Sequence, residues 1–203
     1  MPIAEYLEDL WNCRGQADRV SSWMQESGFY AGCRTIVEIG PGSGRFLVPT
    51  LERAKPLRYE IYETASLWAQ WLVRANQPYV ISRPADGWSL GATPSDSCEL
   101  AHAHGVFVYL NPLTCFEYFM EMMRVTMPGG HVVFDFFPCD SFDERSVLAW
   151  LAVKDRFATL LPRPVVTQFF QRRGYDLVST FHRRVAAGRA TYLAFRNVGD
   201  LRT

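Results

Sequence analysis

The sequence predicts an α/β fold in which buried strands and helices alternate along the chain. Its clearest unit is an apolar run at 35–39 that ends in Gly40, Gly42 and Gly44 and is followed by a segment of helical apolar spacing. A second unit is the apolar run 131–136, which follows a proline and two glycines. A short apolar run bounded by glycine indicates a buried strand, and the change of period after it indicates a turn and a helix.

Length and composition agree with one ordinary globular domain. The chain has 203 residues, of which 48% are hydrophobic and 21% charged, and these values argue against disorder. Its 21 basic and 21 acidic residues give a net charge of zero. No general attraction to nucleic acid is therefore expected.

Cysteine usage and the N-terminus predict a cytoplasmic protein. The five cysteines are scattered without C-x-x-C or Cys/His ligand spacing, which predicts reduced thiols and no structural zinc. Residues 1–10 contain acidic residues but no basic one, so we expect no export signal. No apolar run reaches the roughly 18 residues of a membrane-spanning helix, and no membrane partner is expected.

The first 33 residues predict two short helices ahead of the first strand. Apolar residues recur at helical spacing within 3–11 and within 20–24. Such a segment either lies over a ligand site or simply covers one edge of the sheet.

The glycines after the first strand suit a bound nucleotide or nucleoside. Without Cβ atoms at Gly40, Gly42 and Gly44, the backbone can adopt positive φ and a ligand can lie directly against it. The N-terminus of the following helix also favours an anionic group. The alternative is an ordinary glycine-rich turn. Arg45 occupies the third-glycine place of the G-x-G-x-x-G dinucleotide loop, which argues against that class.

An acidic side chain is predicted at the carboxyl end of the second strand, 58–63. Glu63 follows the loop by roughly 20 residues, where a carboxylate can accept hydrogen bonds from both hydroxyls of a ribose. Glu60 is the alternative candidate, and an exposed strand-end charge is the plainer interpretation of Glu63. Thr64 is placed to cap the next helix, 67–75.

The third strand, 79–82, is followed by Asp86, Gly87 and Trp88. On residue chemistry alone this is an Asp-Gly turn. The ring of Trp88 could stack on a nucleobase.

Two histidines lie near the end of the fourth strand, which begins at 98. His102 and His104 are two residues apart, so they point to the same face at the carboxyl edge, where ligands bind in open parallel sheets. A histidine there can act as a general base near neutral pH, and His104 is the better candidate because it is nearer the tip. A hydrogen-bonded structural role is the alternative. Since the sequence places no third ligand beside them, we predict no metal site.

The remaining segments continue the alternation. A helix with an apolar stripe at 116–123 should be stopped by Pro128, and Gly129 and Gly130 should allow a tight reversal into the strand 131–136. The later spacing predicts helices over 141–161 and 165–173, then strands over 175–183 and 190–196 joined by a loop at 184–189. The basic tract at 182–184 is expected to be solvated, and contact with an acidic substrate is the alternative.

Two motifs resemble those of class I S-adenosylmethionine-dependent methyltransferases. Residues 38–44 read E-I-G-P-G-S-G and resemble the family's E/D-x-G-x-G-x-G loop, and residues 124–130 read R-V-T-M-P-G-G, similar to the segment before its fifth strand. The resemblance implies a doubly wound, Rossmann-like sheet of seven mostly parallel strands in the order 3-2-1-4-5-7-6, with helices on both faces. It also implies a single methyltransferase domain, made of a helical cap (1–33), a cofactor-binding core (34–137), and substrate-side helices with the closing strand pair (138–203).

The same resemblance implies the cofactor S-adenosyl-L-methionine, with S-adenosyl-L-homocysteine as the product. The glycine loop would lie under the methionine part, Glu63 would bind the ribose, and Asp86 would meet the adenine, on which Trp88 could stack. The residues that it assigns to the cofactor are Glu38, Gly40, Gly42, Gly44, Glu63, Asp86, Gly87, Trp88 and His102. The catalytic candidates are His104 and His102.

The expected reaction is methyl transfer to an O or N nucleophile of a small-molecule or natural-product substrate. The Asn/Asp-Pro-Pro-Tyr/Phe signature of amino-group methylation on adenine or glutamine is absent, since residues 102–105 read H-A-H-G. One alternative is a non-catalytic, cofactor-binding partner subunit. Another is a NAD(P)-dependent oxidoreductase, against which Arg45 counts. The sequence leaves the formation of a homo-oligomer open.

Overall fold

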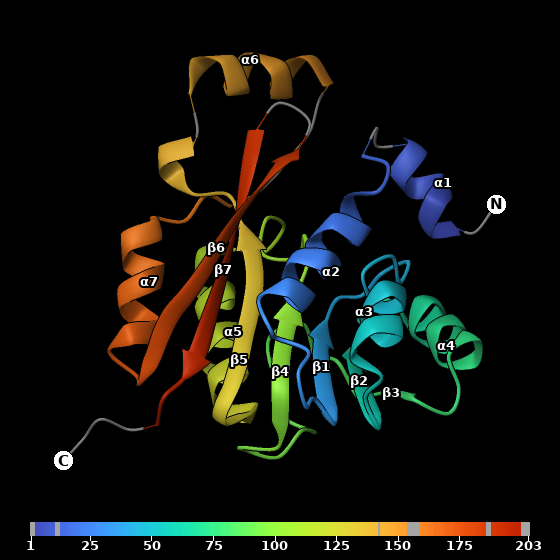
Figure 1. The fold of residues 1–203 in the computed structure, drawn as a ribbon. Coiled ribbons are helices and arrows are strands. Elements are labelled where there is room, and N and C mark those ends of the chain that lie inside the picture. The colour runs from blue at the N-terminus through green and yellow to red at the C-terminus, as the bar shows by residue number, and fades with distance from the viewer. Residues whose placement is uncertain (1–2, 11–12, 142, 154–158, 186–187, 200–203) are drawn as a thin grey trace.

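The computed structural model describes residues 3–10, 13–141, 143–153, 159–185 and 188–199. The strands are β1 (Thr35–Ile39), β2 (Arg58–Tyr62), β3 (Val80–Ser82), β4 (Cys98–Ala103), β5 (Thr126–Phe136), β6 (Tyr175–Val185) and β7 (Gly188–Asn197). They form one seven-stranded sheet in the order β3-β2-β1-β4-β5-β7-β6 (Figure 1). β7 runs antiparallel to both β5 and β6, whereas the other pairs are parallel. The predicted fold class and strand order are confirmed.

Helices cover both faces of the sheet. They are α1 (Ile3–Leu10), α2 (Gln16–Glu26), α3 (Leu47–Ala54), α4 (Ser66–Ala75), α5 (Pro112–Val125), α6 (Glu144–Val153) and α7 (Arg163–Gln171), with a short 3₁₀ turn η1 at Cys139–Ser141. Buried side chains place α2, α3 and α4 on one face and α5 and α7 on the other. The two helices expected within the first 33 residues are confirmed.

The face under α2 and α3 combines aliphatic packing with polar residues near its carboxyl end. Met24 of α2 and Leu47 of α3 are fully buried, as is Ile36 of β1. α3 has eight residues, and Pro49 lies in its first turn, where the N–H groups have no partner within the helix. The helix therefore accommodates Pro49 without losing a hydrogen bond.

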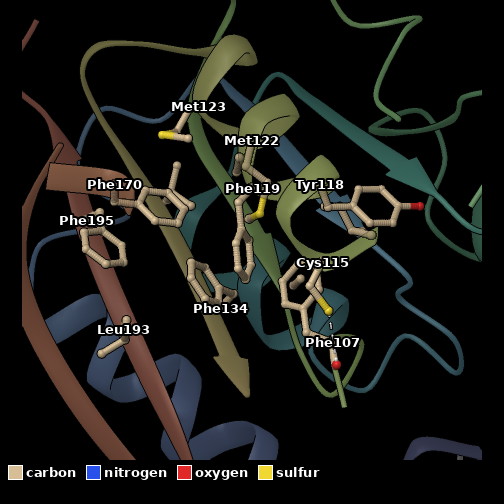
Figure 2. Close-up of a cluster of buried hydrophobic side chains, with 14 of the residues drawn as sticks. Phe107, Cys115, Tyr118, Phe119, Met122, Met123, Phe134, Phe170, Leu193 and Phe195 are labelled. Atoms are coloured by element: carbon tan, nitrogen blue, oxygen red, sulfur yellow. Dashed lines mark hydrogen bonds between the residues drawn. The ribbon is translucent and has the colours of Figure 1, made fainter. Parts of the chain in front are cut away.

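Figure 2 shows the aromatic cluster that fills the opposite face, under α5 and α7. The rings of Phe119 and Phe134 stack with centroids 4.5 Å apart, and those of Phe170 and Phe195 stack at 4.2 Å. One ring of each pair comes from a helix and the other from β5 or β7. Because each aromatic pair contributes about 0.5–1.5 kcal/mol beyond its burial, the cluster fixes both helices on the sheet.

The join between α5 and β5 differs from the prediction. α5 ends at Val125, before Pro128, and β5 begins at once because Thr126 pairs with Cys98. The next pair is His131 with Leu100, so residues 127–130 bulge from the ladder between these positions. The proline and glycines therefore shape an irregularity within the strand and do not stop the helix.

The segment after β5 also differs from the predicted helix over 141–161. α6 occupies only part of that range, and residues 154–158 lie outside the described part of the chain. Leu161 forms a parallel bridge with Pro138, next to the end of β5. This pairing extends the sheet edge and takes Leu161 out of any helix.

The closing helix begins two residues earlier than predicted, and both closing strands are longer than predicted. α7 begins at Arg163 and accommodates Pro164 in its first turn, where a missing N–H loses no hydrogen bond. β6 continues to Val185 and β7 begins at Gly188, so both strands extend into the expected loop. The tip at 186–187 lies outside the described residues.

α1 and α6 lie beyond the carboxyl ends of the parallel strands (Figure 1). Large apolar side chains of these two helices are more than half exposed, namely Tyr6 and Leu10 of α1 and Leu148 and Leu151 of α6. Within the described ranges, none of the helices has the length and apolar character needed to span a membrane.

Candidate functional site

The glycine loop lies at the carboxyl end of β1, as predicted. Gly40, Gly42 and Gly44 all have positive φ, at 59°, 53° and 74°. A Cβ on Gly40 would lie 2.8 Å from Val106 Cγ2, and one on Gly44 would lie 2.5 Å from Leu72 Cδ2. A Cβ on Gly42 would meet nothing within 4 Å. Two glycines therefore allow close packing inside the protein, whereas the third leaves open space above the loop.

Glu63 joins this loop to the end of β2. Its Oε2 accepts the Gly42 N–H at 2.8 Å, and its Oε1 accepts the Ala65 N–H at 2.8 Å. Each carboxylate oxygen has a second lone pair for another donor. The structure thus brings together the two features that the sequence proposed for a nucleoside site.

Two other expectations about this region are corrected. Ala65, not Thr64, is the N-cap residue of α4, and no side chain caps the helix from that position because alanine has no hydrogen-bond acceptor in its side chain. The Ala65 N–H donates to the Glu63 carboxylate. Glu60 is fully buried, and its carboxylate pairs with Arg83 at 2.6 Å and Arg58 at 3.1 Å. It is held in an ion-pair cluster, so it does not compete with Glu63 for the edge of the sheet.

Asp86, Gly87 and Trp88 lie in an exposed turn after β3. The Asp86 carboxylate accepts the Ser89 hydroxyl at 2.5 Å and the N–H groups of Trp88 at 2.9 Å and Ser89 at 2.7 Å. Partial burial raises the pKa of Asp86, but these bonds, that of the Ser89 hydroxyl foremost, lower it overall. The Trp88 side chain is 54% exposed. Asp86 therefore organises its own turn, and its role toward adenine stays a prediction.

Two hollows adjoin these residues. One of about 620 Å³ lies between α4 and the ends of β2 and β3 and has Glu63 in its lining. The other, of about 320 Å³, has Asp86 in its lining, and Ala85 borders both. Glu63 and Asp86 thus line two separate hollows that share Ala85.

His102 and His104 point to the same face of the sheet, as predicted, but the sequence missed their partners. His102 Nδ1 lies 2.7 Å from His104 Nε2, and the other nitrogens lie 2.9 Å from Tyr59 Oη and 3.1 Å from Tyr192 Oη. Phe46 stacks on the His104 ring with centroids 4.2 Å apart. Both ring nitrogens of each histidine are therefore engaged, and the base role of His104 stays a prediction.

The chain of polar groups continues to Glu38, beneath the glycine loop. Tyr59 Oη donates to Glu38 Oε2 at 2.6 Å. Burial raises the pKa of Glu38 to about 8, although the hydrogen bond from Tyr59 opposes this rise. Burial lowers the pKa of both His102 and His104 well below the ordinary value, so both imidazoles are neutral at neutral pH.

Glu38, His102 and His104 each bring one potential metal-ligating atom within 4.8 Å of the others. The sequence did not place Glu38 beside the histidines. Glu38 lies in β1 and His102 in β4, and residues of different strands become neighbours only through the pairing of strands in the sheet. The ring nitrogens already make hydrogen bonds, and Tyr59 lies between His102 and Glu38. We therefore assign no metal site to this group.

A buried ion pair lies on the same face. Arg183 of β6 donates to Asp135 Oδ2 of β5 and to Gln16 Oε1 of α2, both at 2.7 Å. Asp135 Oδ1 also accepts the Gly105 N–H at 2.6 Å, which fixes the end of β4. Arg183 is only 7% exposed, which corrects the expectation that the basic tract is solvated. Asp135 could have been found in the sequence as a functional candidate, because it is the polar residue near the carboxyl end of the otherwise apolar run 132–137.

No protein-family model matches the chain, and no curated protein matches it in sequence. Solved structures match it in fold. An O-methyltransferase family protein from Burkholderia thailandensis has a TM-score of 0.70 at 18% identity, over 97% of this chain and 60% of that chain. The chain thus spans less than two thirds of that protein.

Two further solved structures carry a named ligand. The 1,6-didemethyltoxoflavin-N1-methyltransferase of Burkholderia thailandensis, with bound 1,6-didemethyltoxoflavin and S-adenosylhomocysteine, has a TM-score of 0.70 at 14% identity over 95% of this chain and 82% of that one. The N-methyltransferase NodS of Bradyrhizobium japonicum, in complex with S-adenosyl-L-homocysteine, has a TM-score of 0.66 at 15% identity over 90% and 87%. The fold of this chain is that of class I S-adenosylmethionine-dependent methyltransferases.

Proposed function

We propose that this chain is an S-adenosylmethionine-dependent methyltransferase that acts on an O or N nucleophile of a small-molecule substrate. The observation that carries the proposal is the junction of Glu63 with Gly42. A half-buried carboxylate meets the loop backbone at 2.8 Å, beside a glycine whose Cβ position is open. This junction offers acceptors for a ribose and a flat backbone for the rest of a nucleoside.

The residues present fit the cofactor. The loop around Gly42 would lie under its methionine part, and Glu63 would accept its ribose hydroxyls. Asp86 borders the hollow for its base, and the exposed Trp88 lies two residues further along the same turn. When bound, S-adenosylmethionine supplies a methyl group whose C–S bond breaks with its electron pair left on sulfur. The protein then has to orient the nucleophile and receive its proton.

Apolar side chains at the carboxyl edge support a small organic acceptor. Tyr109, after β4, is 63% exposed, and Leu10 of α1 and Leu151 of α6 are 61% and 69% exposed. These residues lie on segments next to the predicted reaction edge (Figure 1). Sites for small organic ligands commonly combine apolar walls with a few polar groups.

Binding calorimetry with S-adenosylmethionine, S-adenosylhomocysteine and NADH tests the cofactor. We expect both S-adenosyl compounds to bind, and Glu63→Ala to weaken binding by about 1–3 kcal/mol through loss of charge-assisted hydrogen bonds. G42A should weaken binding as well, because its methyl group would enter the open space over the loop. G32A is the matched control, since Gly32 also has positive φ (72°) and no atom within 4 Å of a Cβ. Binding of NADH alone would reject the proposal.

One observation favours the alternative of a non-catalytic, cofactor-binding subunit. Both ring nitrogens of His104 bond to protein groups, so the side chain presents no free nitrogen to a substrate in this conformation. A screen of phenols, amines and carboxylic acids for S-adenosylhomocysteine release separates the two functions. Release with any acceptor excludes the non-catalytic function.

A further inference from the structure

Five buried side chains on or directly after four strands form one unbranched chain of hydrogen bonds. Its order is Tyr192 of β7, His104 directly after β4, His102 of β4, Tyr59 of β2, and Glu38 of β1. The four contacts measure 3.1, 2.7, 2.9 and 2.6 Å. His104 is 7% exposed, whereas the other four members are at most 1% exposed. His104 is thus the member nearest the carboxyl edge, and Glu38 is the buried end.

The chemistry of the members fixes the direction of the hydrogen bonds when Glu38 is ionised. A carboxylate can only accept, so Tyr59 donates to Glu38 and must accept from His102 Nε2. The neutral His102 then accepts at Nδ1 from His104 Nε2. The neutral His104 accepts at Nδ1 from Tyr192. Each contact carries one proton, and none is left unsatisfied.

The same contacts are satisfied when Glu38 is protonated. Glu38 then donates to Tyr59, which donates to His102 Nε2, and each histidine carries its proton on Nδ1. His104 Nδ1 finally donates to Tyr192 Oη. Every hydrogen bond therefore runs in the opposite direction in the second state. The second state also holds one proton more than the first, and Glu38 carries it.

We propose that this chain is a proton relay that carries the proton of the methyl acceptor from His104 to Glu38. The inference rests on the proposed function. The methyl acceptor takes the place of the Tyr192 hydroxyl at His104 Nδ1. As the acceptor's lone pair bonds to the methyl carbon, its O–H or N–H proton passes to that nitrogen, while Tyr192 keeps its own proton. The His104 Nε2 proton passes to His102 Nδ1, the His102 Nε2 proton to Tyr59 Oη, and the Tyr59 proton to Glu38 Oε2. Neither imidazole nor phenol keeps a charge.

Charged groups around His104, where the proton enters the chain of hydrogen bonds, disfavour a proton that remains there. Arg45, which precedes α3, and Arg183 of β6 both disfavour a cationic His104, as does its burial. Tyr192 of β7 is neutral, since burial raises its pKa well above the ordinary value. The entrance is therefore a poor place for a positive charge to remain.

Charges around the far end favour a protonated acceptor. Glu38 is buried, and the nearby Glu63 carboxylate further disfavours its ionised form. Tyr30, which follows α2 in the chain, and Tyr59 of β2 also face Glu38. Their phenols remain neutral at neutral pH. On β4 it faces His102, whose burial keeps it uncharged. Glu38 is thus the member able to hold the proton, and it can receive one only in its ionised form, whose share grows as the pH approaches and passes about 8.

The proton positions of the histidines test the relay directly. In ¹⁵N-histidine-labelled protein, two-bond ¹H–¹⁵N spectra distinguish the Nδ1–H from the Nε2–H tautomer. We expect His102 and His104 to be Nε2–H above about pH 8 and Nδ1–H below it, with one common midpoint set by Glu38. His131 and His182 lie outside the chain of hydrogen bonds and serve as internal controls. The matched variants are E38Q and Y59F. E38Q removes the titratable carboxyl of Glu38 and Y59F removes the Tyr59 hydroxyl, and both keep nearly the full volume of the side chain.

The expected result is loss of the common midpoint in both variants, with the spectra of His131 and His182 confirming that each variant is folded. A fixed tautomer in the wild type, a switch that survives in E38Q, or separate imidazolium titrations would overturn the relay. S-adenosylmethionine binding is measured on the same samples. Binding without the coupled switch rejects the relay alone, whereas absence of binding rejects the proposed function and with it the proton source.

Discussion

Replacing Glu38 by glutamine should change how stability depends on pH. In the unfolded chain this carboxyl ionises near its ordinary value of 4.5, whereas burial raises its pKa in the fold to about 8. Between these values the folded state binds more protons than the unfolded state, so Glu38 makes the free energy of unfolding fall as pH rises. Its contribution is fully present below about pH 4.5 and is lost progressively up to about pH 8.

The magnitude follows from the difference between the two pKa values. At 1.36 kcal/mol per pKa unit, a rise from 4.5 to about 8 corresponds to about 5 kcal/mol. The glutamine amide of E38Q keeps an acceptor for Tyr59 but does not titrate. E38Q should therefore gain about 5 kcal/mol relative to the wild type between pH 4.5 and pH 8.

Urea unfolding of both proteins at several pH values measures this difference, because the contributions of other carboxyl groups cancel. E52Q is the matched control, since it removes an exposed carboxyl on α3. Its stability relative to the wild type should show no comparable change with pH. A difference between E38Q and the wild type that stays constant from pH 4.5 to pH 8 would refute the reasoning.

Two further substitutions test the buried face. D135N should destabilise the fold by about 3–5 kcal/mol in urea unfolding, because Arg183 would keep its buried charge without a carboxylate; D135N/R183M should recover much of this loss, and equal stability of D135N and the wild type would contradict the ion-pair argument. G44A should cost about 1–3 kcal/mol more than G32A, because its Cβ would collide with the buried Leu72, whereas both carry the same backbone strain. Equal losses in thermal or urea unfolding would show that Leu72 yields freely.

The fold and the cofactor loop followed from local signals in the sequence. The run of glycines after 35–39 and the acidic Glu63 at the end of the next strand each have a local physical meaning, and the structure joins them. Alternation along β4 predicted that His102 and His104 share a face. These inferences need only the residue order within one strand or turn.

The partners of the histidines could not be predicted in the same way. Tyr59 and Tyr192 reach them from β2 and β7, and only the order of strands in the sheet makes them neighbours. Arg183 appeared as part of a solvated basic tract because its partner Asp135 lies 48 residues away. Tertiary pairing also overrode local spacing at Leu161, which bridges to Pro138.

The placement of β7 between β5 and β6 has a consequence for how the molecule is made. Tyr192 and Arg183, which complete the buried polar face, belong to β7 and β6, which follow the other five strands of this sheet in chain order. Until that hairpin inserts, Asp135 and His104 have no cover from the C-terminal side. During synthesis, this side of the buried polar face can therefore close only after both strands of the hairpin have been made.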